Sequence, residues 1–78
     1  VNNIELKMIE FSKNLKNERI LNGLTQKEMA NKLGISYRTY QNYELTSENN
    51  REPDLKTLCK ISEILSVSVD YLLGIDKY

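Results

Sequence analysis

The sequence predicts an all-α fold of five short helices in one small domain spanning residues 1–78. Apolar residues recur at helical spacing along most of the chain, and no segment shows the two-residue alternation of a β-strand. Three segments also open with a Ser or Thr N-cap flanked by apolar residues that can close a hydrophobic staple. These local signals agree with one another, as one defined fold requires.

The first two helices are separated by a glycine. Apolar residues at positions 11, 15, 20 and 24 predict a helix over roughly 9–22 that ends near Gly23. Positions 4 and 8 continue this spacing, so the helix can begin nearer Asn3 and make residues 1–10 an N-terminal extension. Thr25 and Glu28 form a capping box at the start of the second helix, which Gly34 ends.

The last three helices follow in quick succession. Ser36 caps the third helix only two residues after Gly34, and a polar loop follows at 45–52. Ser68 caps the fifth helix. Pro53-Asp54 opens the fourth helix, whose expected inner face consists of Leu55, Leu58, Ile61, Ser62 and Leu65.

The composition excludes several classes of site. The chain has one cysteine and no histidine, so an intramolecular disulfide and a Cys/His zinc site are both excluded, and no cofactor is expected. Cys59 lies near Leu58 and Ile61 and is expected to be a small, inert core residue. With no glycine-rich phosphate loop and no evident pair of catalytic carboxylates, the sequence does not predict an enzyme.

The chain shows no signal for a membrane or for export. No apolar run approaches the ~18 residues that a membrane span needs, and the N-terminus has no secretory pattern, so a cytoplasmic location is expected. The net charge is zero, but residues 13–51 hold seven basic and four acidic side chains. This positive middle is compatible with a DNA-facing surface, and also with an ordinary solvated one.

The joint between the second and third helices is the most informative feature. Gly34 allows a sharp turn, and Ala30, four residues earlier, is small enough for the next helix to cross closely. Tyr40 is then expected to point back into the core. With Ser36, these residues favour a helix-turn-helix motif at about 25–44. The alternative is an ordinary αα-hairpin, which shares the glycine but needs neither Ala30 nor the short joint.

Residues 15–74 resemble the phage-repressor (Cro/cI, XRE-type) helix-turn-helix family. The resemblance is carried by Arg19, LTQKEMA, Gly34-Ile35-Ser36, Tyr43-Glu44 and VSVDYLLG. It implies a five-helix lambda repressor-like DNA-binding domain. In that family the third helix lies in the major groove of double-stranded operator DNA.

The resemblance also implies roles for individual residues. Tyr37, Arg38 and Asn42 stand at the base-reading positions, where Arg38 suits guanine, Asn42 suits adenine, and Tyr37 suits a thymine methyl or a phosphate. Arg19 and Glu44 stand where the family forms a structural ion pair. The expected phosphate contacts are Gln26, Lys27, Thr39, Asn49, Asn50 and Arg51.

The loop after the third helix departs from the family pattern. The family usually places Asn-Gly after the glutamate and reaches proline sooner, whereas here 45–52 reads LTSENNRE. Glu48 within it would repel a phosphate. Self-contact is expected through the final segment, where Val69, Leu72, Leu73 and Ile75 exceed what a small core can absorb.

We therefore expect a sequence-specific transcriptional regulator, most simply a repressor that binds an inverted-repeat operator as a homodimer. No small-molecule ligand is inferred. Two other functions fit the same fold: the antitoxin of a toxin–antitoxin pair, and a protein-interaction module that has lost DNA binding. Steep salt dependence of DNA binding distinguishes a DNA-binding protein from an interaction module.

Overall fold

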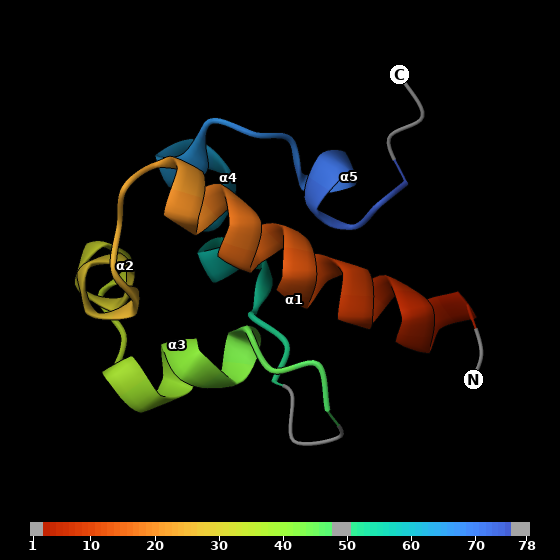
Figure 1. Ribbon diagram of the computed structural model, residues 1–78, viewed down its shortest axis with the longest axis horizontal. Helices are drawn as coiled ribbons and strands as arrows, with labels where there is room; N and C mark the ends of the chain where they lie inside the picture. The colour runs from red at the N-terminus through yellow and green to blue at the C-terminus, as the bar shows by residue number, and fades with distance from the viewer. Residues whose placement is uncertain (1–2, 48–50, 76–78) are drawn as a thin grey trace.

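The computed structural model describes residues 3–47 and 51–75, and these form five helices and no strand (Figure 1). The fold is all-α and lambda repressor-like, which confirms the predicted class. The helices are α1 (Asn3–Leu21), α2 (Gln26–Leu33), α3 (Tyr37–Tyr43), α4 (Leu55–Leu65) and α5 (Val69–Leu72).

The long helix α1 crosses the molecule, and the shorter helices pack around its C-terminal two thirds (Figure 1). Helix α2 packs on α3 and α4, while α5 packs on α1 and α4. The core between them consists of Phe11, Leu15, Met29, Ala30, Leu33, Tyr40, Tyr43, Ile61, Leu65 and Leu72. Helix α3 lies at the edge of this core, with one face inward and the other toward solvent.

The predicted helix starts are confirmed by their caps. The Thr25 hydroxyl accepts the amide of Glu28 at 3.0 Å, and the Glu28 carboxylate accepts the amide of Thr25 at 2.8 Å, which completes the capping box. Ser36, Asp54 and Ser68 cap α3, α4 and α5, each with its side chain accepting a backbone amide of the first turn. Helix α1 begins at Asn3, so the earlier of its two expected starts is the right one.

Two expectations about α4 were wrong. Leu55 was placed on the inner face but is 80% exposed, and Cys59 was placed in the core but is exposed. Leu58, Ile61 and Leu65 do face inward. Leu55 lies on the same side of the helix as Leu58, but it occupies the first turn of α4, which extends beyond the core. Cys59 follows Leu58 by one residue, about 100° around the helix, and so points away from the core.

The expectation for the final segment was also wrong in large part. Leu72 is fully buried, Leu73 packs against the core, and Val69 is partly buried. Lys7 on α1 donates to the carbonyl of Gly74 at 3.0 Å and so holds the end of this segment. Of the four residues expected to exceed the core, Ile75 is the one that is exposed.

Candidate nucleic-acid interface

The joint between α2 and α3 has the geometry that the sequence motif predicts. Gly34 adopts the left-handed conformation (φ 71°, ψ 31°), and the amide of Ile35 donates to the Ala30 carbonyl at 3.1 Å. The backbone at Ser36 is extended (φ −70°, ψ 151°), and its hydroxyl accepts the amide of Thr39 at 3.0 Å. Ala30 is buried at the crossing. The chain therefore ends one helix and begins another within three residues.

A buried polar cluster holds the C-terminal end of α3 against α1 and α2. The Arg19 guanidinium donates through Nε to Glu44 Oε2 at 2.7 Å and through Nη2 to Glu44 Oε1 at 3.1 Å. Its Nη1 donates to the carbonyl of Leu24 at 2.7 Å. The Gln26 amide also donates to Glu44 Oε1, at 2.9 Å, and the hydroxyl of Tyr40 donates to Glu44 Oε2. We name Arg19, Gln26, Tyr40 and Glu44 the anchor cluster.

The electrostatics of the anchor cluster keep its ion pair charged. Burial by itself would raise the pKa of Glu44, but the hydrogen bonds from Arg19, Tyr40 and Gln26 outweigh it and hold that pKa below its ordinary value. The hydrogen bond to Glu44 raises the pKa of Arg19. Burial, and then the bond to Glu44, raise the pKa of Tyr40, so this phenol remains a donor. Glu44 accordingly accepts hydrogen bonds from all three neighbours.

A second buried contact fixes α3, and the sequence analysis missed it. Ser12 is fully buried on α1, and its hydroxyl donates to the carbonyl of Tyr43 at 2.8 Å. Carbonyls in the last turn of a helix have no partner within the helix, so an outside donor stabilises the end. Nothing in the sequence identifies this pairing, because the two residues are 31 positions apart and serines are common on exposed helix faces.

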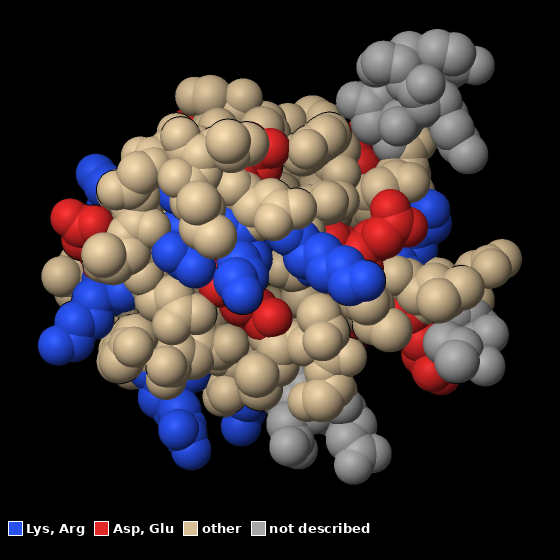
Figure 2. All heavy atoms as spheres, in the orientation of Figure 1, with Lys and Arg blue, Asp and Glu red and all other residues tan. Residues whose placement is uncertain are grey.

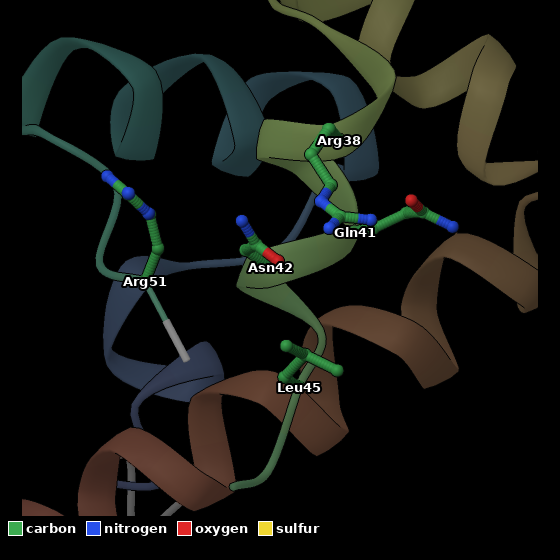
Figure 3. A pocket seen from close by; sticks show the side chains of 5 residues that line it. All are labelled: Arg38, Gln41, Asn42, Leu45 and Arg51. Atoms are coloured by element: carbon green, nitrogen blue, oxygen red, sulfur yellow. The ribbon is translucent and has the colours of Figure 1, made fainter. Parts of the chain in front are cut away.

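The outer face of α3 presents the expected base-reading residues to solvent. Arg38 is exposed and Asn42 is half-buried beside it, one helical turn along. They border a hollow of about 650 Å³ that is lined by Arg38, Gln41, Asn42, Leu45 and Arg51 (Figure 3). The amide of Arg51 donates to the carbonyl of Asn42 at 3.1 Å, which ties the wall of this hollow to the end of α3. We name it the α3 hollow.

Tyr37 lies on a different side of α3 from Arg38. It borders a second hollow, of about 550 Å³, with Lys16, Arg19, Thr25, Gln26 and Lys27. The ammonium group of Lys27 stands 5.8 Å from the centre of the Tyr37 ring, within cation–π range. This side therefore combines basic side chains with the N-terminus of α2, a combination that favours phosphate. Lys16 is a basic residue here that the sequence analysis did not select.

The remaining predicted contacts are placed as follows. Thr39 is half-buried, and its hydroxyl accepts from the Ser36 hydroxyl at 2.8 Å. Gln26 is half-buried and donates to Glu44, and its amide nitrogen carries a second hydrogen. Arg51 is exposed at the wall of the α3 hollow. Asn49 and Asn50 lie outside the residues that the structure describes.

Positively charged side chains lie around the outer face of α3. Figure 2 shows Lys and Arg side chains projecting from the edge of the molecule where Figure 1 places α3. Across residues 3–47 and 51–75, no group of three or more potential metal ligands comes together, and no helix is long and apolar enough to cross a membrane.

A short, glycine-ended helix leading through a tight joint into a second helix with an exposed polar face defines the class of helix-turn-helix domains. A family model described as helix-turn-helix matches residues 15–72. The chain therefore belongs to the helix-turn-helix family, of the XRE type that the sequence resembles.

Named relatives agree with this assignment. The chain is 59% identical over 63 residues to the uncharacterized HTH-type transcriptional regulator YqaE of Bacillus subtilis, covering 81% of this chain and 52% of the relative. It is 45% identical over 69 residues to the HTH-type transcriptional regulator ImmR of the same organism, with 88% and 52% covered. It is 33% identical over 66 residues to the cryptic phage CTXphi transcriptional repressor RstR of Vibrio cholerae, with 85% and 56% covered.

These relatives are named for regulating transcription and not for an enzymatic activity. The chain spans about half the length of the curated relatives it matches. The family model covers all of α2, α3, α4 and α5.

Proposed function

We propose that this chain binds double-stranded operator DNA, with α3 in the major groove, and represses transcription by occluding a promoter. The observation that carries the proposal is the orientation of α3, whose inner face is held by the anchor cluster while Arg38 and Asn42 face solvent. The names of the relatives support a regulator of transcription. DNA as the partner implies a cytoplasmic location.

In this proposal the two sides of α3 have different partners. Arg38 donates to the acceptors of a guanine, and Asn42 pairs with an adenine. Tyr37 faces the second hollow, where its hydroxyl suits a phosphate better than a base edge. Gln26 and Lys27 bind the sugar–phosphate backbone on that side. Arg51 binds the backbone from the wall of the α3 hollow, and Thr39, Asn49 and Asn50 are further proposed phosphate contacts.

A homodimer on an inverted repeat completes the proposal, because one such motif contacts only a few base pairs. Half-sites would lie about 34 Å apart, one turn of the duplex. The surface we assign to the second copy surrounds Leu55, which protrudes beside an apolar hollow of about 210 Å³. A protruding side chain next to a hollow on the same patch suits a two-fold contact. Glu52 lines this hollow, and Lys56 follows Leu55 in the sequence and is exposed.

The function is tested by selecting binding sites from random duplex DNA and measuring affinity across salt concentrations. We expect an inverted-repeat consensus and an affinity that falls steeply with salt, with a slope set by the number of phosphates contacted. A library that yields no enriched sequence, with no binding even at low salt, would contradict the proposal and favour a protein-interaction module. Enrichment of a single half-site without symmetry would contradict the dimer alone.

The dimer surface is tested with two leucines of similar exposure. Leu55→Lys should weaken self-association on operator DNA, as measured by sedimentation of free and DNA-bound protein. Leu21→Lys is the matched control, because Leu21 is 76% exposed at the end of α1 and does not line that hollow. If the two variants and the unmodified protein sediment equally, Leu55 is not part of the dimer interface.

A further inference from the structure

The α3 hollow contains one apolar side chain among polar ones. Arg38, Gln41, Asn42 and Arg51 line it with donors and acceptors, whereas Leu45 contributes only hydrocarbon. Leu45 is 37% exposed and does not belong to the core or to the apolar residues packed against it. In Figure 3 its side chain lies next to Asn42 and on the same side of the hollow.

The backbone explains why Leu45 extends the face of α3. Glu44 at the C-cap keeps a right-handed helical conformation (φ −90°, ψ −2°), and the amide of Leu45 donates to the Asn42 carbonyl at 3.4 Å. Glu44 therefore keeps the helical course, and Leu45 is the first residue beyond it. Arg38 and Asn42 lie one turn apart on one side of α3, and Leu45 lines the same hollow as both of them.

The neighbouring residues leave Leu45 no inward alternative. Tyr43 is buried in the core and Glu44 is held by the anchor cluster, so the two preceding side chains already occupy the inner side. The amide of Arg51 donates to the Asn42 carbonyl and brings the opposite wall of the hollow to α3. Leu45 consequently faces the hollow. In the proposed function, the edge of a base enters this hollow together with the sugar–phosphate backbone of the DNA.

We propose that Leu45 is a specificity-determining residue that recognises the 5-methyl group of a thymine in the major groove. This inference rests on the proposed function. Thymine is the only base that presents a methyl group there, and an apolar side chain is the group that recognises it. With a rise of 1.5 Å per residue, Leu45 stands about 10 Å along the helix from Arg38, on the order of three base-pair steps. The thymine therefore lies beyond the bases that Arg38 and Asn42 read.

The test removes the methyl group from the DNA and the leucine from the protein, singly and together. Site selection with the unmodified protein and with Leu45→Ala identifies the position at which thymine is preferred only when Leu45 is present. Deoxyuridine is then placed at that position. We expect the unmodified protein to lose about fourfold in affinity, the factor that corresponds to ~0.8 kcal/mol for one buried carbon group. Leu45→Ala should bind both duplexes equally, and Leu45→Met should retain the sensitivity to the methyl group.

The outcomes separate this inference from the proposed function. If no DNA sequence is selected at all, the proposed function fails. If an operator is selected but deoxyuridine has no effect at any thymine, or has the same effect in Leu45→Ala, the assignment of Leu45 is overturned. Equal loss of affinity for all sequences together with loss of self-association would place Leu45 in a contact between two copies instead. A thermal melt of Leu45→Ala controls for folding, and no large change is expected at an exposed site.

Discussion

The inner and outer faces of α3 belong to one helix of seven residues, but they differ in how many contacts they make with the rest of the protein. On the inner face Tyr40 and Tyr43 are buried edge to face, with ring centroids 6.1 Å apart, and Glu44 beyond them accepts hydrogen bonds from three side chains. On the outer face Tyr37 is 43% exposed and Arg38 is exposed. The inner contacts orient the helix and the outer side chains are left for a partner, so the two roles can be changed separately.

The largest effect is expected from breaking the anchor cluster. Glu44→Ala leaves the Arg19 guanidinium buried without its carboxylate, and removal of one partner of a buried ion pair typically costs about 3–5 kcal/mol of unfolding free energy. Chemical denaturation should show this loss, and operator affinity should fall without a change of consensus. Glu63→Ala, which removes an exposed carboxylate from α4, is the control. An unchanged melting temperature in Glu44→Ala would contradict an orienting role.

The outer face should respond in the opposite way. Arg38→Ala should relax the preference at one operator position by about 1–3 kcal/mol, because a bidentate contact to guanine is lost. Its unfolding free energy should stay within about 0.5 kcal/mol of the unmodified protein, since Arg38 is exposed. Lys60→Ala removes an equal charge from the exposed side of α4 and should leave the consensus unchanged. A consensus untouched by Arg38→Ala would disprove the assignment.

A smaller effect is expected at the contact between α1 and the end of α3. Ser12→Ala removes the donor to the Tyr43 carbonyl and should cost about 1–3 kcal/mol, the penalty for a buried acceptor that loses its partner. Denaturation of this variant should be compared with Lys13→Ala, at the adjacent exposed position. If the two variants are equally stable, the Ser12 hydroxyl does not hold α3.

The smallest expected effect is a gradual decrease of the unfolding free energy as the pH falls. The pKa of Glu44 is lower in the folded protein than its ordinary value of 4.5, so its contribution to stability is complete above about pH 4.5 and is lost as pH falls through the folded pKa. The unfolding free energy should therefore decrease on acidification below that pH. In Glu44→Gln the decrease should be shallower, because the group no longer titrates. Parallel pH profiles for the two proteins would show that other carboxylates dominate.

Much of the local structure follows from the sequence. The capping residues predict where α2, α3 and α5 begin, because each cap and its partner amide lie within three residues of one another. Gly34 predicts the turn for a similar reason, since only its own backbone conformation decides it. Such features need no knowledge of distant parts of the chain.

The predictions from sequence failed for residues whose burial depends on how far the core extends. Leu55 has the helical angle of Leu58 and Ile61, but periodicity does not tell how far along α4 the core reaches. The final segment was expected to carry surplus apolar residues, whereas Leu72 is buried in the core and Leu73 packs against it. These two errors concern what lies opposite a residue, and that is decided by elements far away in the sequence.

The sequence by itself thus determined the helices, their caps and the glycine joint, because these depend on spacing within one or two helical turns. Only the tertiary structure decided which contacts hold α3 in place and what stands beside Leu45. Ser12 reaches Tyr43 across 31 residues, and a contact of that separation exists only after the helices have packed. Arg19 reaches Glu44 across 25 residues, and this pair was expected from the family resemblance and not from any local spacing. Packing also brought Arg51 to the end of α3 and so created the hollow that a base edge is proposed to enter.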